Sequence, residues 1–191
     1  MIREEHGFTL PELLVGMTLL AIVLTAFGQM LITSSKTSNR VEEQAALQME
    51  VRASIDRLTT DFRQATTTGA VSPVESVGST AFTFDSPDRG TPLHLRRIAY
   101  RVVNGQLERS TTISTNTGAS PWVWPNTPGA WIPELTSITN TTPFTFYDAS
   151  GVATTTVSAV HSMRITLSVS PKQNQGGANT YSTLVTIRTL Q

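Results

Sequence analysis

The sequence predicts an α+β fold, in which one long N-terminal helix packs on an antiparallel β-sheet head. Three patterns indicate this fold. Residues 13–32 form an apolar run without a charge, residues 47–65 repeat apolar side chains at helical spacing, and after Gly69 apolar and polar residues alternate. Helical periodicity therefore comes first along the chain, and strand periodicity follows it.

The apolar run, LLVGMTLLAIVLTAFGQMLI, has Gln29 as its only strongly polar residue. As a helix it would cover about 30 Å, the thickness of the hydrocarbon core of a bilayer. A buried helix of a soluble protein is one alternative. A secretory signal peptide is another, but its apolar region is shorter and ends at a small-x-small cleavage site, which is not found here. The run therefore predicts a transmembrane helix.

Residues 7–12, Gly-Phe-Thr-Leu-Pro-Glu, stand directly before this run. They resemble the type III signal of prepilins, in which a short polar leader ends in Gly, Phe follows, and Glu is the fifth residue of the mature chain. The resemblance implies that prepilin peptidase cleaves between Gly7 and Phe8 and that the new amine of Phe8 is N-methylated. The leader departs from the family because it carries one Arg against two Glu, and Pro11 replaces an aliphatic residue. Proline is tolerated in the first turn of a helix.

Glu12 places a carboxylate at the edge of the predicted span, where an unpaired charge costs free energy. In the prepilin family the corresponding Glu of an incoming subunit is thought to pair with the N-terminal amine of a neighbour. The resemblance therefore implies an assembly role for Glu12. The alternative is an interfacial Glu that extends towards water.

The helix is predicted to continue beyond the membrane, from residue 9 to residue 67, with Gly69 as its cap. Two helices broken near residues 33–38 are the alternative. One apolar stripe and one solvated charged face are expected on the second half. The stripe comprises Leu47, Val51, Ile55, Leu58, Phe62 and Ala65, and the charged face comprises Glu50, Arg52, Asp56, Arg57, Asp61 and Arg63. The predicted segments are a leader (1–7), a membrane half (8–33), an amphipathic half (34–68) and a β-rich head (69–191).

Six strands are predicted in the head, at residues 81–84, 95–103, 106–110, 144–147, 163–169 and 181–189. Asn104-Gly105 between two of them is a two-residue hairpin signal, and residues 171–180 form a loop. Residues 98–109, IAYRVVNGQLER, and residues 144–151, FTFYDASG, resemble segments of J-type minor pseudopilins and their minor-pilin counterparts. Together with the N-terminal signal, this resemblance implies a pilin-like fold.

No pattern in the sequence indicates an enzyme, a cofactor or a metal site. The chain has no cysteine, and His6, His94 and His161 are too scattered to be joint ligands. Residues 85–90, DSPDRG, could offer two carboxylates to calcium, but a turn is the simpler interpretation. The net charge is zero, so the chain has no overall positive charge to attract nucleic acid, although a local basic patch could still bind it.

Residues 111–133 contain Trp122, Trp124 and Trp131 among four prolines. Tryptophan is enriched at interaction hot spots, so this segment, the Trp loop, is a possible partner surface. The alternative is that the loop folds back and covers the open edge of the sheet.

The sequence as a whole implies a minor structural subunit of a type IV pilus or a type II secretion pseudopilus. Its expected partners are prepilin peptidase, sister pilins or pseudopilins, and an assembly platform of the inner membrane. It is expected to cross the inner membrane once, with an extracytoplasmic head, and then to join the fibre. The alternative is a pilin-anchored binding module, an adhesin or a DNA-uptake receptor, that uses the Trp loop and local arginines. These arginines are Arg89, Arg96, Arg97 and Arg101.

Overall fold

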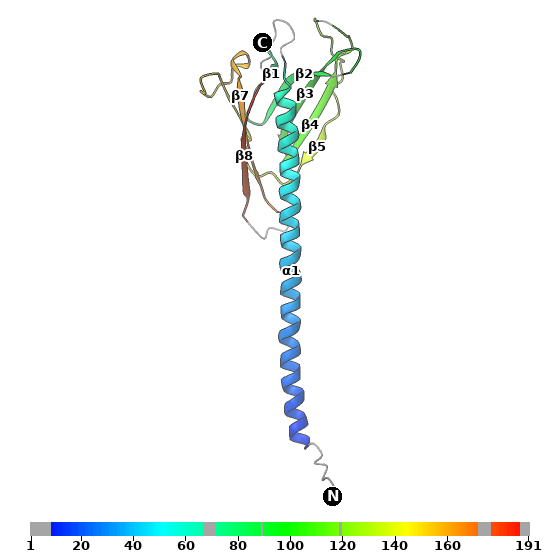
Figure 1. The fold of residues 1–191 in the computed structure, drawn as a ribbon, viewed down its shortest axis with the longest axis vertical. Coiled ribbons are helices and arrows are strands. Elements are labelled where there is room, and N and C mark those ends of the chain that lie inside the picture. The colour runs from blue at the N-terminus through cyan, green and yellow to red at the C-terminus, as the bar shows by residue number, and fades with distance from the viewer. Residues whose placement is uncertain (1–8, 67–71, 89, 119, 172–176, 188–191) are drawn as a thin grey trace. The chain divides into compact units, whose positions relative to one another are not determined.

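The computed structural model describes residues 9–66, 72–88, 90–118, 120–171 and 177–187 (Figure 1). A long helix, α1 (Leu10–Arg63), is followed by strands β1 to β8 and a short 3-10 helix, η1 (Val157–Ala159). The α+β class predicted from the sequence is therefore confirmed. The chain forms two compact units, Met1–Ala45 and Ala46–Gln191, which are described separately below.

Helix α1 runs without a break through residues 33–38, so the alternative of two helices is not observed. The helix ends at Arg63, four residues before the predicted end. Gln64 N–H and Ala65 N–H donate to carbonyls only three residues back, which tightens the last turn. Thr66 N–H then donates to the carbonyl of Asp85 in the sheet at 3.1 Å. The predicted cap, Gly69, lies outside the described residues.

The head contains two antiparallel sheets. The first, sheet A, has the order β1-β2-β3-β4-β5, and the second, sheet B, has the order β6-β7-β8. Sheet A comprises β1 (Val74–Ser76), β2 (Ala81–Asp88), β3 (His94–Val103), β4 (Gln106–Ile113) and β5 (Ile132–Leu135). Sheet B comprises β6 (Phe144–Tyr147), β7 (Ser162–Val169) and β8 (Asn179–Thr186).

All six predicted strands are present, and β6 has the predicted bounds. The turn predicted at residues 85–90 is wrong for residues 85–88, which belong to β2. Pro87 is tolerated there because β1 pairs with β2 only at Thr83 and Phe84, so the missing N–H of Pro87 interrupts no ladder on that side. The sequence pattern missed β1, which has only three residues, and β5, whose four residues include Pro133, a residue that argues against a strand.

The hairpin predicted at Asn104-Gly105 is confirmed. Val103 of β3 pairs with Gln106 of β4, and the two turn residues have φ values of 51° and 71°. Positive φ at both positions is what a type I′ turn requires. The carbonyl of Gly105 also accepts a hydrogen bond from Ile138 N–H at 2.9 Å, so the turn holds the segment that leads from sheet A to sheet B.

The predicted apolar stripe packs in the core of the head. Leu47, Val51, Leu58, Phe62 and Ala65 are buried, and Ile55 is half-buried. Phe62 makes edge-to-face contacts with Phe82 and Phe84 of β2, with ring centroids 6.0 and 5.5 Å apart. Phe82 in turn contacts Phe144 of β6 at 4.8 Å. One aromatic cluster therefore joins the helix and both sheets.

Candidate functional site

The first turn of α1 is capped by Glu12. Thr9 precedes the helix, and Glu12 Oε2 accepts hydrogen bonds from the backbone N–H of Thr9 at 3.5 Å and from its hydroxyl at 3.3 Å. A Glu at the third helical position that reaches back to the N-cap residue is one half of a capping box. Its charge also suits the positive end of the helix dipole. Glu12 therefore stabilises the start of its own helix, a contact that the sequence analysis did not foresee although the Thr-x-x-Glu signature is present.

The other oxygen of this carboxylate, Oε1, has no hydrogen-bond partner among the described residues. Gly7 and Phe8 lie outside the described residues, so the distance from Glu12 to the amine that cleavage would create is not defined. Cleavage after Gly7, N-methylation of Phe8 and pairing of Glu12 with that amine remain predictions.

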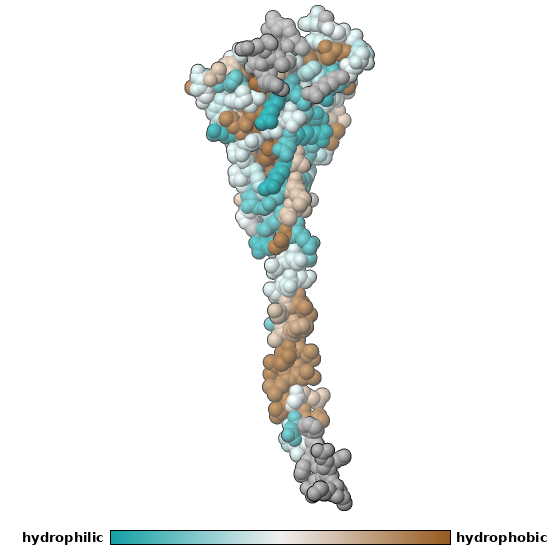
Figure 2. Space-filling model, in the orientation of Figure 1, coloured by the Kyte–Doolittle hydropathy of each residue, from teal (hydrophilic) through white to brown (hydrophobic). Residues whose placement is uncertain are grey.

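The apolar run is exposed along the described part of the N-terminal unit, and Figure 2 shows it as a brown band on the helix. An 18-residue window of α1 has a mean hydropathy of 2.1, and none of it is buried inside the protein. Two hydroxyls within the run donate to carbonyls of the same helix: Thr18 to Val15 at 2.8 Å and Thr25 to Ala21 at 2.7 Å. These groups need no water, as a lipid environment requires. The helix is thus a candidate transmembrane span.

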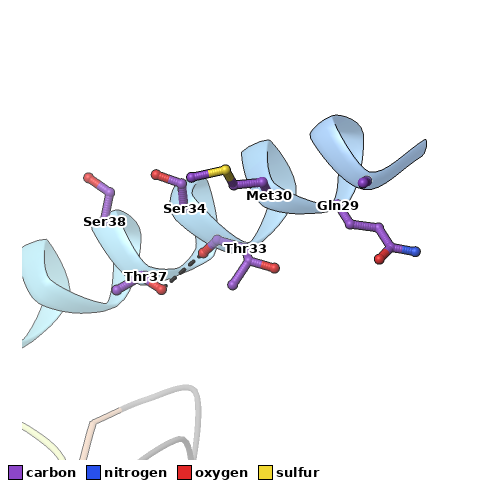
Figure 3. A pocket seen from close by; sticks show the side chains of 7 residues that line it. Gln29, Met30, Thr33, Ser34, Thr37 and Ser38 are labelled. Carbon is purple, nitrogen blue, oxygen red and sulfur yellow. Dashed lines mark hydrogen bonds between the residues drawn. The ribbon is translucent and has the colours of Figure 1, made fainter. Parts of the chain in front are cut away.

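A shallow groove follows one face of α1 where the apolar run gives way to polar residues (Figure 3). It is lined by Ala26, Gln29, Met30, Thr33, Ser34, Thr37 and Ser38. Thr37 donates its hydroxyl to the carbonyl of Thr33 at 2.9 Å, as the dashed line in Figure 3 shows. Because one helix supplies all of these side chains and they are exposed, the groove as lined by this helix does not enclose a small ligand. It marks the change from an apolar to a hydroxyl-rich helix surface.

Asp61 departs from the expected solvated face, because it is buried between α1 and sheet A. Its Oδ2 accepts hydrogen bonds from the Tyr100 hydroxyl and from Arg109 Nε, both at 2.8 Å. Burial, reinforced by the Asp61 carboxylate, raises the pKa of Tyr100, so its hydroxyl stays protonated and acts as a donor. This buried triad of Asp61, Tyr100 and Arg109 ties the amphipathic half of the helix to β3 and β4.

The Trp loop folds over the outer face of sheet A, the face opposite the helix. The guanidinium of Arg97 lies 4.1 Å from the ring centre of Trp124, and that of Arg101 lies 4.0 Å from Trp131. Arg97 and Arg101 both belong to β3, a central strand, so the loop covers a face rather than the open edge that was considered. The edge itself is formed by β5, directly after Trp131. Each Trp remains half-buried, and Trp122 Nε1 has no hydrogen-bond partner in the described part of the chain.

Three of the four arginines considered for nucleic acid lie beside carboxylates. Arg97 contacts Asp85 at 3.1 Å and Glu75 at 2.7 Å, and Arg101 contacts Glu108 at 2.7 Å. Nε of Arg96 lies 4.0 Å from Asp88, and Arg89 is outside the described residues. Because acidic partners offset the charges of Arg96, Arg97 and Arg101, these three side chains do not form a free basic patch.

Within the described ranges, no group of three or more His, Asp or Glu side chains could hold a metal ion. Asp85, considered for calcium, is bound to Arg97 instead. His94 Nδ1 lies 3.0 Å from the carbonyl of Ser114, and His161 is exposed directly before β7 of sheet B. His6 lies outside the described residues.

Residues 2–28 match the model of the prokaryotic N-terminal methylation motif. The match covers the predicted leader except Met1, the cleavage position and most of the apolar run. Together with the exposed apolar helix, it supports a type IV pilin-like subunit that is membrane-anchored and processed. No curated protein matches the chain. The closer likeness to J-type minor pseudopilins therefore rests on the sequence resemblance alone.

Proposed function

We propose that the chain is a minor structural subunit of a type IV pilus or of a type II secretion pseudopilus, and that it has no enzymatic role. The methylation motif at residues 2–28 is the observation that carries this proposal, because it overlaps an exposed apolar helix that begins at Leu10. The likeness of residues 98–109 and 144–151 to J-type pseudopilins favours a minor subunit over a major one.

In this proposal, prepilin peptidase removes residues 1–7, Phe8 is methylated, and the span leaves the inner membrane to join a bundle of sister helices. Water is excluded inside such a bundle, so an unpaired Glu12 carboxylate would carry a large desolvation cost. Its Oε2 caps its own helix, and its Oε1 accepts no hydrogen bond from any residue that the structure describes. One carboxylate can thus serve both its own first turn and the N-terminal amine of a neighbour.

Mass spectrometry of the N-terminus tests the proposal. The protein isolated from membranes should begin at a methylated Phe8. Gly7→Leu should block cleavage and leave membrane insertion intact, whereas Gly16→Ala, a change inside the span with nothing within 4 Å, should be processed normally. An intact Met1 in the wild-type protein, or cleavage after the apolar run, would contradict the proposal.

A binding module on a pilin stem is the second candidate. The half-buried rings of Trp122, Trp124 and Trp131 favour it, since part of each ring stays open to a partner. The pairing of Arg97 and Arg101 with carboxylates weakens the nucleic-acid version. A deletion strain with intact fibres but without adhesion or DNA uptake would support this candidate, and a strain without fibres would support the structural one.

A further inference from the structure

The strand β8 forms a long open edge of sheet B. Each of the other sheet edges is short or interrupted. Strand β1 has three residues and a register shift, and β5 has four residues including Pro133. Strand β6 has four residues, and its Phe146 carbonyl accepts a hydrogen bond from the N–H of Thr154. By contrast, β8 has eight residues, NTYSTLVT, without a charge, a proline or a glycine. Proteins normally protect edge strands by keeping them short or by placing charges, prolines or bulges in them, because unpaired backbone groups attract another strand.

The hydrogen-bond pattern shows which backbone groups of β8 are unpaired. Ile187 N–H donates to His161 at 3.0 Å, which makes these two opposite residues a hydrogen-bonded pair. Such pairs alternate along an antiparallel ladder, so the odd-numbered residues of β8 bond to β7. The even-numbered residues direct N–H and C=O to the open side, and no hydrogen bond joins this side to another described segment. These residues are Thr180, Ser182, Leu184 and Thr186.

The side chains of the same four residues are exposed on the outer face of sheet B. Two of them continue a row of hydroxyls from β7: Thr180 contacts Ser168 at 2.8 Å, and Ser182 contacts Thr166 at 3.2 Å. Leu184 is 53% exposed. The four outward side chains of β8 itself carry no charge, and the charged side chain opposite them on β7 is Arg164, which pairs in register with Leu184 and lies over the ring of Tyr147.

We propose that the open edge of β8 receives an extended, uncharged strand from the head of a sister subunit. Backbone pairing of this kind is an established mode of peptide recognition. The inference rests on the proposed function, because only a fibre places sister heads side by side. Two copies of β8 would pair antiparallel about a twofold axis, which would give the two heads opposite directions. The subunits of one fibre all share one direction, so the partner is a different strand.

Site-directed cross-linking in native fibres tests the inference. The full chain has no cysteine, so a single Thr180→Cys variant can carry a benzophenone-maleimide probe at one position. A matched control is Val152→Cys, in the Asp148–Val152 turn, where the side chain is 62% exposed. After shearing and irradiation, peptide mapping should locate the Thr180 cross-link in a strand of another protein with an N-terminal methylation motif. The Val152 probe should give no such product.

A second pair of variants separates backbone pairing from simple proximity. Ser182→Pro removes an N–H that faces the open side and leaves the ladder to β7 intact, as is tolerated in edge strands. In the Thr180→Cys background it should lower the cross-link yield by at least about tenfold, without changing the thermal unfolding of the head. Ser182→Ala keeps the N–H and should retain the cross-link.

The outcomes distinguish this inference from the proposed function. If the processed chain is present in sheared fibres but the Thr180 probe captures nothing, captures a second copy of this chain, or is insensitive to Ser182→Pro, the strand inference is wrong and the fibre role stands. If the chain is unprocessed and absent from fibres, the proposed function fails, and the inference fails with it.

Discussion

Removing the carboxylate of Asp61 should destabilise the head more than any other single change on the charged side of α1. Asp61→Ala leaves the Tyr100 hydroxyl and the Arg109 guanidinium without their shared acceptor. The side chains of Asp61 and Arg109 are only 13% and 12% exposed, so water cannot fully replace the lost contacts. Arg109 would then carry a nearly buried charge without a partner.

The expected loss in the free energy of unfolding is about 3–5 kcal/mol, which is typical when one partner of a buried ion pair is removed. About 1–3 kcal/mol of such a loss is typical of leaving one buried hydroxyl, here that of Tyr100, without its acceptor. Asp61→Asn should cost less, about 1–3 kcal/mol, because the amide oxygen still accepts one hydrogen bond. Since a domain of this size is typically stable by about 5–15 kcal/mol, Asp61→Ala should leave the head marginal.

Urea unfolding of a soluble fragment beginning at Ser38, followed by tryptophan fluorescence, measures these losses. Asp56→Ala is the matched control, since Asp56 is an exposed acid on the same helix, and it should stay within about 0.5 kcal/mol of wild type. Combining Asp61→Ala with Arg109→Ala should recover at least about 1.5 kcal/mol relative to the sum of the single changes. A loss below about 1 kcal/mol for Asp61→Ala, or strict additivity of the pair, would refute the role assigned to this triad.

Three further predictions concern the anchor and the core. Glu12→Ala should still insert in membranes, but its amount in sheared fibres relative to the membrane pool should fall. Glu12→Gln can still cap the helix, and it should resemble Ala because charge pairing drives assembly. If both variants reach the wild-type ratio, Glu12 is only an interfacial residue that extends towards water. Phe62→Ala should destabilise the head by about 3–5 kcal/mol in urea unfolding. Met49→Ala should have little effect, because the Met49 side chain is 71% exposed. A loss under about 0.5 kcal/mol for Phe62→Ala would show that the apolar stripe does not pack in the core of the head. Burial, opposed by Arg97, raises the pKa of Asp85 from 3.8 to about 6. Its contribution to the free energy of unfolding is therefore present below about pH 4 and declines as pH rises to about 6. Asp85→Asn should flatten the dependence of stability on pH between about 4 and 6, and an unchanged slope would disprove the assignment.

Local patterns predicted most of the fold. The stripe from Leu47 to Ala65 and the hairpin at Asn104-Gly105 each depend on residues close in the chain, so periodicity and turn chemistry were sufficient. The pattern Thr9-x-x-Glu12 also predicts that Glu12 caps the helix, whereas the resemblance to prepilins implies only its assembly role. Cleavage and methylation at Gly7 and Phe8 could be predicted only through that resemblance.

The interactions that the sequence did not reveal join distant residues. Asp61 was assigned to the solvated face because its neighbours on the helix are charged, yet Tyr100 and Arg109 lie 39 and 48 residues away along the chain. The contacts of Trp124 and Trp131 with arginines of β3 are equally non-local. Periodicity gives the face of an element, but it does not give the side chains that the sheet brings opposite to it.

The tight turn at Asn104-Gly105 decides where a fluorescent or epitope label can be inserted. It is a surface hairpin and would be an obvious choice, but a side chain at Gly105 would come within 3.0 Å of the Ile138 carbonyl, on the segment that connects the two sheets. An insertion there would pull on both sheets. The turn that contains Gly151 has nothing within 4 Å of that position, and it can carry a tag for imaging the protein in living cells without disturbing the head.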